Sequence, residues 1–416
     1  MSLIAVEDAA ARITAGLERL PAEAVPLLAA LGRVLAEDIH ADRALPANPT
    51  SSMDGFAVRA TDAAQAPATL TLVADIPAGV MPQVVLGPGE AARIMTGAIV
   101  PQGADAVVPV EDTSADWNAG DSAPLGAAVS ILRAPRSGDY IRPTGSDLSP
   151  GQHLLKAGVT LRPPDIGVLA VLGQATVPVV RQPVVAILST GDELVEPGQT
   201  LAQGQIYDAN AYALATLVQS WGALPVRVPA ARDTLASVRE AFHSALAHSP
   251  DLILSSAGVS VGAYDVVRAV IEELGAVDFW RVNVRPGKPL AFGHIGGVPL
   301  IGLPGNPVSA LVTAELFVRP ALSALGGWPA SVETVQAAAG EALHSDGRRS
   351  YLRVILRRDG QNWTAVTTGT QSSSTLLSLV LADGLLIIPE GVTEIALGSL
   401  CTVRLLRPLP RAAEEE

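Results

Sequence analysis

Residues 184–193 read Val-Val-Ala-Ile-Leu-Ser-Thr-Gly-Asp-Glu, an apolar run that ends in hydroxyl, glycine and carboxylate residues. The apolar part, Val184 to Leu188, predicts a buried strand. Polar residues directly after a buried strand are typical of a ligand crevice, because open α/β sheets bind ligands at the carboxyl ends of their strands. The residues at this strand end are Ser189, Thr190, Gly191, Asp192 and Glu193.

Three similar segments follow at the ends of other apolar runs. They are Gly258-Val-Ser-Val-Gly262 with Tyr264-Asp265 after it, Arg285-Pro-Gly-Lys-Pro289, and Gly302-Leu-Pro-Gly-Asn-Pro307. Glycines let backbone N–H groups approach an anion, and hydroxyl, arginine and lysine side chains can hold its oxygens. With the carboxylates among them, the four segments predict phosphate or oxyanion chemistry assisted by a divalent metal.

Short apolar runs alternate with helical patterns between residues 183 and 325. Asp208 predicts the cap of one helix, and Asn306 with Pro307 predicts the start of another that runs to about Leu325. Strands alternating with helices predict right-handed βαβ crossovers and a doubly wound, mostly parallel α/β sheet.

The flanking segments differ in character. Residues 5–38 predict two helices broken by Pro21 and Pro26. Short β-branched runs between Leu45 and Pro135 predict a β-rich insert, and those after residue 329 predict a small β-barrel or sandwich. We expect a helical linking domain (1–45 and 138–180), a β-rich insert (46–137), the α/β domain (181–326) and a C-terminal β-barrel (330–410).

The composition argues against several classes of protein. A net charge of −13 argues against nucleic-acid binding, which requires a basic face. Cys401 is the only cysteine, so the sequence predicts no disulfide framework and no cysteine-based metal site. The N-terminus lacks the basic region of a signal peptide, and prolines interrupt the apolar stretch 163–180, which argues against a membrane span. We expect a soluble, cytoplasmic protein.

Lysine is rare in this chain, which contains only Lys156 and Lys288. Lys288 stands between a glycine and a proline, where a compact ammonium fits a tight oxyanion pocket better than a planar guanidinium. The structural alternative is a chance lysine in a surface loop. Arg281 and Arg285 are spaced to lie on the same face of the preceding strand.

Two further observations leave alternatives open. Gly258-Val-Ser260-Val-Gly262 matches the G-x-S-x-G nucleophile elbow of serine hydrolases, but no clear acid–histidine pair follows it, so an anion-cradling turn is favoured. The stretches around Asp54 and Thr96 carry polar residues in the β-rich insert, and alone they predict ordinary turns.

Together these stretches resemble the molybdopterin molybdenumtransferase family, the MoeA-type enzymes that include the C-terminal part of gephyrin. The matching motifs cover nearly the whole chain, which makes the resemblance specific. They are Ser52-Met-Asp-Gly-Phe-Ala-Val58, Met95-Thr-Gly-Ala98, Gly103-Ala-Asp-Ala-Val107, Ser189-Thr-Gly-Asp-Glu-Leu194, Gly258-Val-Ser-Val-Gly262, Pro286-Gly-Lys-Pro289 and Gly302-Leu-Pro-Gly-Asn-Pro-Val-Ser309.

The resemblance implies molybdenum cofactor biosynthesis in an elongated homodimer. The active site would lie between the α/β domain of one subunit and the β-rich insert of the other, which would contribute Asp54 and Thr96. The implied reaction uses adenylylated molybdopterin, molybdate and Mg²⁺, releases AMP and inserts molybdenum into the pterin dithiolene. The molybdopterin adenylyltransferase is a candidate protein partner.

The resemblance also implies roles for individual residues. Asp192, Glu193 and Asp265 are the expected Mg²⁺ ligands. The expected catalytic residues are Asp54, Thr96, Glu193, Asp265 and Lys288. The expected substrate-binding residues are Ser189, Thr190, Gly191, Gly258, Ser260, Gly262, Arg281, Arg285, Pro304, Gly305, Asn306, Pro307 and Ser309.

The sequence also departs from the family pattern. Ala257 replaces a usual glycine, and Ala263 replaces a usual acid before Tyr264-Asp265. Loss of that carboxylate weakens the case for metal binding. Two alternatives therefore stay open: a catalytically altered paralogue that binds the pterin or serves as a scaffold, and a serine hydrolase that uses Ser260.

Overall fold

The computed structural model describes residues 3–117, 123–256, 264–329 and 331–409. Backbone contacts divide the chain into two compact units. The larger unit comprises residues 1–36, 158–166 and 175–416, and the smaller unit comprises residues 37–157 and 167–174. Each unit is described by itself below.

A six-stranded sheet forms the centre of the larger unit, with the strand order β15-β12-β16-β20-β19-β17. The first four strands are mutually parallel, and β19 and β17 are antiparallel to their neighbours. This arrangement confirms the expected α/β fold class. The strands are β15 (Leu224–Arg227), β12 (Val184–Ser189), β16 (Leu252–Ser256), β20 (Val298–Leu303), β19 (Pro289–Ile295) and β17 (Gly275–Arg281).

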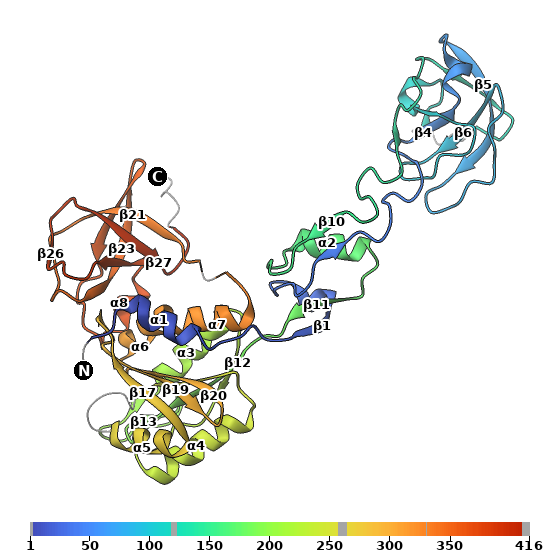
Figure 1. Ribbon diagram of the computed structural model, residues 1–416. Coiled ribbons are helices and arrows are strands. Elements are labelled where there is room, and N and C mark those ends of the chain that lie inside the picture. The colour runs from blue at the N-terminus through green and yellow to red at the C-terminus, as the bar shows by residue number, and fades with distance from the viewer. Residues whose placement is uncertain (1–2, 118–122, 257–263, 330, 410–416) are drawn as a thin grey trace. The chain divides into compact units, whose positions relative to one another are not determined.

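Helices cover both faces of this sheet (Figure 1). Val185 and Ile187 of β12 pack into the core on the side of α3, α6 and α7, whereas Ala186 and Leu188 pack against α4 and α5. The alternation follows from the two-residue period of a strand, and it explains why β12 is apolar throughout. The helices are α3 (Ala209–Ser220), α4 (Leu235–Ala247), α5 (Tyr264–Leu274), α6 (Pro307–Thr313) and α7 (Arg319–Gly326).

The helix that begins at Pro307 is the expected long helix, and it contains a π-helical segment, η5 (Ala314–Val318), between α6 and α7. The buried Glu315 in that segment accepts hydrogen bonds from Arg319 and Arg404. The span Pro307–Gly326 is long and apolar enough to cross a membrane, but it is mostly buried inside the fold. We therefore assign it as a core helix.

The N-terminal segment differs from the sequence prediction. Helix α1 (Val6–Thr14) is present, but the second expected helix is replaced by strand β1 (Ala22–Pro26) and a 3₁₀ turn, η1 (Leu27–Ala30). β1 pairs antiparallel with β11 (Thr176–Val180). Pairing with a strand more than 150 residues away therefore overrides the local helix preference of an alanine-rich segment.

The C-terminal part of the larger unit is a closed β-barrel. Strands β23, β24, β21, β27 and β25 follow one another, and β25 also pairs with β23, which closes the ring. The short β18 (Val284–Arg285) joins its edge at β23. The barrel strands are β21 (Thr334–Ala339), β23 (Arg349–Asp359), β24 (Asn362–Thr367), β25 (Gly384–Ile388) and β27 (Leu400–Leu405), with β22 (Leu343–His344), β26 (Glu394–Ile395) and the one-turn α8 (Leu377–Val380) between them.

The smaller unit contains a five-stranded sheet with the order β7-β4-β6-β5-β8, and Phe56 of β4 lies in its core. Two short ribbons, β2–β10 and β3–β9, extend from this sheet. The elements are β2 (Ile39–His40), β3 (Thr50–Ser51), β4 (Gly55–Val58), η2 (Ala60–Ala63), β5 (Ala68–Ile76), β6 (Glu90–Ile94), β7 (Ala106–Pro109), η3 (Val110–Asp112), β8 (Ala128–Ile131), β9 (Ile141–Arg142) and β10 (His153–Leu155). Helix α2 (Pro163–Val171) begins in the larger unit and ends in the smaller one. The expected domain boundaries stay a prediction.

Candidate functional site

The carboxyl ends of β12 and β16 form the polar floor of a crevice in the larger unit. Ser189 and Ser256 end these adjacent parallel strands, and their buried hydroxyls lie 3.1 Å apart. The next residue, Thr190, is only 2% exposed, and its Oγ1 has no hydrogen-bond partner among the described residues. A buried hydroxyl without a partner costs about 1–3 kcal/mol, so this position fits a ligand that completes the bond.

Three carboxylates lie beside this floor. Thr190 forms a parallel bridge with Ala231, which brings the loop at Asp192 and Glu193 next to Asp233. The Asp233 N–H donates to Asp192 Oδ1 at 3.2 Å, and the Asp233 Oδ1 is buried without a partner in the described part of the chain. Burial, followed by the nearby charges of Asp192 and Glu193, raises the pKa of Asp233 above its ordinary value.

Asp233 lies beside this candidate site, and the sequence analysis did not single it out. A signal was present in the sequence, because Asp233 stands between an apolar run, which forms strand β15, and the segment that forms helix α4. Three predicted residues, Gly258, Ser260 and Gly262, lie outside the described residues. Asp265 lies in the first turn of α5. Their predicted roles stay predictions.

The loop after β20 forms the opposite wall of the crevice. Asn306 occupies the N-cap position of α6, as expected, but its side chain makes no capping bond. Instead its amide donates to Ser373 Oγ at 3.2 Å, and the Asn210 amide donates to the Gly305 carbonyl at 2.7 Å. These bonds fix the loop between α3 and the segment that precedes α8.

These walls enclose a cavity of about 590 Å³, here called the strand-end pocket. Its volume lies in the ordinary range for small-molecule sites. Most of its lining comes from segments that the sequence singled out. The lining residues are Thr190, Glu193, Leu194, Ile206, Tyr207, Asp208, Ala209, Asn210, Ser256, Gly287, Pro289, Pro304, Gly305, Asn306, Pro307, Ser309 and Ser374.

A second cavity of about 400 Å³, here called the cationic pocket, shares Gly287 and Ser309 with the first. Gly287 has a φ of 104°, and a Cβ there would lie 2.2 Å from Thr313 Cγ2, so the loop that carries Lys288 packs tightly on α6. Four basic side chains line this pocket. Its lining residues are Arg285, Pro286, Gly287, Lys288, Ser309, Arg348, Tyr351, Leu352, Arg353, Gln371, Ser372 and Ser373.

Arg353 of β23 is the most unusual of these side chains because it is only 1% exposed. Its Nε donates to Ser378 Oγ at 3.2 Å and its Nη2 donates to the Ser372 carbonyl at 3.1 Å. It forms no ion pair with any carboxylate that the structure describes. Burial, and to a smaller extent the charge of Arg285, lowers the pKa of Arg353 to about 10. A buried cation without a counter-ion fits an anion as its partner.

One predicted relationship between arginines is wrong. Arg281 ends β17 in the central sheet, whereas Arg285 belongs to β18 at the barrel edge. Val282 and Asn283 between them are buried, and Asn283 N–H donates to the Ile4 carbonyl at 2.7 Å. This contact with the N-terminal segment interrupts the strand, so the two arginines do not share a face. Arg285 lines the cationic pocket, and Arg281 is not among the lining residues of either pocket.

The smaller unit holds the other predicted site residues. Asp54 Oδ1 accepts hydrogen bonds from the backbone N–H of Thr96 at 2.6 Å and from Thr96 Oγ1 at 2.7 Å. These two bonds lower the pKa of Asp54, the backbone bond contributing more. The turn is tight, because a Cβ on Gly55 would lie 2.0 Å from the Val108 carbonyl oxygen.

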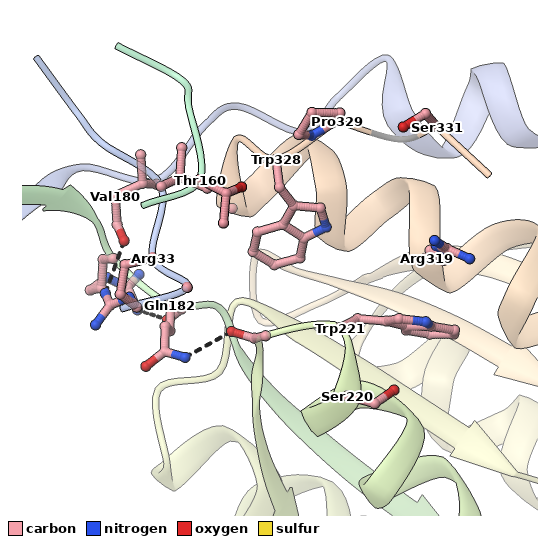
Figure 2. A pocket seen from close by; sticks show the side chains of 15 residues that line it. Arg33, Thr160, Val180, Gln182, Ser220, Trp221, Arg319, Trp328, Pro329 and Ser331 are labelled. Atoms are coloured by element: carbon pink, nitrogen blue, oxygen red, sulfur yellow. Dashed lines mark hydrogen bonds between the residues drawn. The ribbon is translucent and has the colours of Figure 1, made fainter. Parts of the chain in front are cut away.

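A third pocket of about 390 Å³ lies at the opposite edge of the central sheet, where β12 and β15 begin (Figure 2). Trp221 and Trp328 line it, and Gln182 donates a hydrogen bond to the Gly222 carbonyl. Each of its three arginines pairs with a carboxylate: Arg33 with Glu23, Arg181 with Asp251, and Arg319 with Glu315. None of the sequence-predicted site residues is among its lining residues.

Comparison with known proteins matches almost the whole chain to three family models. Residues 4–173 match the MoeA N-terminal region (domain I and II), and residues 186–324 match a probable molybdopterin binding domain. Residues 336–406 match the MoeA C-terminal region (domain IV). The model boundaries place both the strand-end pocket and Lys288 largely within the middle region.

Individual relatives agree with these models. The chain is 40% identical over 387 residues to Molybdopterin molybdenumtransferase 2 of Mycobacterium tuberculosis, covering 90% of this chain and 93% of the relative. It is 40% identical over 388 residues to Molybdopterin molybdenumtransferase of Nostoc sp., covering 90% of this chain and 87% of the relative. The solved structure of the molybdopterin biosynthesis MoeA protein from Pyrococcus horikoshii has a TM-score of 0.82 at 33% identity, covering 98% of this chain and 100% of that one. The fold, the strand-end site and these relationships show that the chain belongs to the MoeA family of molybdopterin molybdenumtransferases.

Proposed function

We propose that this protein transfers molybdenum from molybdate to adenylylated molybdopterin, with Mg²⁺-dependent release of AMP, during molybdenum cofactor biosynthesis. Curated relatives at 40% identity carry the name of this transferase activity. The observation that carries the proposal to this chain is the buried, unpaired Arg353 in a pocket adjoining the strand-end pocket.

The cationic pocket fits an oxyanion such as molybdate. Arg285 and Lys288 supply further N–H donors around Arg353, and Ser309 lies at the junction of the two pockets. Arg348 also lines the pocket, but its guanidinium is paired with Asp346 and donates to the Val284 carbonyl. Charge-assisted hydrogen bonds contribute about 1.5–3 kcal/mol each, which compensates for desolvation of a dianion. In this proposal Lys288, which lines the cationic pocket, holds the oxyanion against the substrate's reacting sulfurs and balances its charge.

The donor set beside the strand-end pocket fits a divalent cation. The unpartnered Oδ1 of Asp233, with its raised pKa next to Asp192 and Glu193, marks a position where positive charge is missing. Mg²⁺ prefers carboxylate oxygens, keeps several waters and binds substrate phosphates. Among the described side chains, no group of three acids, histidines or cysteines converges on one point. We propose that Asp192, Glu193 and Asp265 hold the ion and that Asp233 supports it. When bound, Mg²⁺ would polarise the phosphate that is cleaved.

The pair Asp54–Thr96 in the smaller unit supports a shared active site. Both residues are exposed, yet two short hydrogen bonds hold the carboxylate in place. A fixed, ionised carboxylate at an exposed turn suits contact with a second molecule. We propose that a homodimer brings this pair to the partner's crevice, and that a molybdopterin adenylyltransferase supplies the substrate in the cytoplasm.

The test is AMP release by the purified protein from adenylylated molybdopterin, with and without molybdate and Mg²⁺. Release that requires both supports the transferase. Tight pterin binding without AMP release under any condition would instead favour the binding or scaffold paralogue. Labelling by a serine-directed fluorophosphonate that is lost in Ser260→Ala would favour a hydrolase.

A further inference from the structure

We propose that Tyr207 is a stacking platform for a flat, fused nitrogen heterocycle of the substrate, either its pterin or its adenine. The inference rests on the proposed function and deepens it. Among the described residues that line the strand-end pocket, Tyr207 is the only aromatic one. Its side chain is 44% exposed and that of its neighbour Ile206 is 54% exposed, so the two leave an apolar surface inside a polar crevice.

The Tyr207 ring is held in position rather than free to fold away. Its hydroxyl donates to the Gln199 carbonyl at 2.9 Å. Its backbone pairs with Val195, and the N–H of the next residue, Asp208, donates to the Val195 carbonyl at 3.0 Å. The buried Asp208 side chain then caps α3 by accepting from the Ala211 N–H at 3.0 Å. An aromatic ring fixed at both ends loses little entropy when a second ring stacks on it.

The polar groups around this surface suit the edge of such a heterocycle. Thr190 presents an unpartnered buried Oγ1, and Glu193 presents a carboxylate that can accept from ring N–H groups. The Asn210 amide is already used on the Gly305 carbonyl, which leaves its own oxygen as an acceptor. In this arrangement the face of the heterocycle stacks on Tyr207, and its edge forms hydrogen bonds with Thr190 and Glu193.

The charges of the two adjoining pockets determine which part of the substrate lies where. In the described part of the chain, the residues that line the strand-end pocket include Glu193 and Asp208 but no lysine, arginine or histidine. Four basic side chains line the cationic pocket, and one of them, Arg348, is paired with Asp346, which leaves Arg285, Lys288 and Arg353 to attract an anion. An anionic group of the substrate is therefore repelled from the strand-end pocket and attracted to the cationic pocket. The uncharged heterocycle is therefore assigned to the strand-end pocket, against Tyr207.

The test compares wild type, Tyr207→Phe and Tyr207→Leu in titrations with 6-hydroxymethylpterin and, separately, with AMP. Removal of the aromatic ring on which a base stacks should lower the affinity by about 5- to 160-fold. Tyr207→Leu should weaken the binding of one of the two ligands by that factor. If the pterin is the ring that stacks on Tyr207, this variant should also abolish the quenching of pterin fluorescence. Tyr207→Phe should bind within about twofold of wild type. Weakening of pterin alone assigns the pterin, and weakening of AMP alone assigns the adenine.

Tyr140→Leu is the matched control, because Tyr140 is 43% exposed but lies in the smaller unit. It should bind both ligands as wild type does, and circular dichroism should show that each variant is folded. Equal affinity of wild type and Tyr207→Leu for both ligands, or no binding of either ligand by wild type, overturns the inference.

AMP release separates the two proposals. If wild type binds the ring but never releases AMP, the proposed function fails alone. If wild type releases AMP and Tyr207→Leu has an unchanged KM, the stacking inference fails alone.

Discussion

The Asp54 carboxylate accepts two hydrogen bonds from one residue, the N–H and the hydroxyl of Thr96, which lies 42 positions further along the chain. Sequence patterns marked both residues separately, and the five-stranded sheet brings them together because β4 and β6 are neighbours. Their pairing gives the smaller unit a fixed anionic group at an exposed turn.

Thr96→Val should raise the pKa of Asp54, because it removes the hydroxyl bond and keeps the backbone bond. A carboxyl whose pKa is lowered by folding stabilises the protein at pH values above its unfolded-state pKa. This stabilisation is lost as the pH falls through its folded-state pKa. The variant should therefore lose activity at a higher pH than wild type on the acid side. NMR titration of the Asp54 carboxyl measures the shift, and Thr69→Val is the control. An unchanged Asp54 titration would show that the hydroxyl bond does not hold the carboxylate.

Arg353→Met should reduce kcat/KM for molybdate by 100-fold or more, because it removes a buried cation from the cationic pocket. It should not reduce the free energy of unfolding measured without anion, since an unpaired buried charge is costly and methionine fills similar space. In wild type, molybdate should raise the Tm, and in the variant this shift should disappear.

Arg404→Met is the matched control for that prediction. Arg404 pairs with the buried Glu315 at 2.9 Å, and Glu315 also pairs with Arg319, so Arg404→Met leaves that carboxylate with one cation instead of two and should lower the free energy of unfolding. Chemical unfolding of both variants makes the comparison. If Arg353→Met keeps the wild-type response to molybdate, Arg353 is not an anion ligand.

Lys288→Arg should weaken the use of molybdate more than the binding of the pterin. The loop is packed closely on α6, as the 2.2 Å approach of a Cβ on Gly287 to Thr313 shows, so a larger planar group has little room to adjust. We expect the molybdate concentration for half-maximal AMP release to rise at least tenfold. Lys156→Arg, the only other lysine substitution that the chain offers, should have no effect. An unchanged molybdate dependence in Lys288→Arg would mean that any cation suffices at this position.

Asp233→Asn should stabilise the metal-free protein at neutral pH and abolish its response to Mg²⁺. The folded pKa of Asp233 is raised, so ionisation destabilises the fold as pH rises through the unfolded and then the folded pKa. The variant and wild type should therefore have equal Tm values below both pKa values and diverge above them. Glu240→Gln, at an exposed position of α4, is the control. A Mg²⁺-induced rise in Tm that persists in Asp233→Asn would remove Asp233 from the proposed metal site.

Asp265→Ala should abolish AMP release while the oligomeric state stays unchanged. Asp265 lies in the first turn of α5 and is one of the proposed Mg²⁺ ligands. Analytical ultracentrifugation and the AMP assay test the two parts of the prediction. Retained AMP release would exclude Asp265 from the site.

The sequence alone determined the parts of this protein that depend on local order. The apolar run Val184–Leu188, the cap at Asp208 and the Asn306-Pro307 pair predicted their elements, because strand and helix periods and caps are local properties. The four strand-end segments predicted a common site for a simple reason: neighbouring parallel strands end at the same sheet edge. The resemblance carried by the motifs added the family.

Only the tertiary structure decided which side chains meet and which are buried. In the sequence Arg353 resembles an ordinary strand residue, but the fold encloses it beside Ser372 and Ser378, with no carboxylate partner among the described residues. Asp233 looks like a helix cap until the bridge between Thr190 and Ala231 places it beside Asp192. The segment at Ala22–Pro26 is a strand because β11 pairs with it. Each of these outcomes depends on chain segments far apart in sequence, and the electrostatic cost of burying a charge exists only after they pack together.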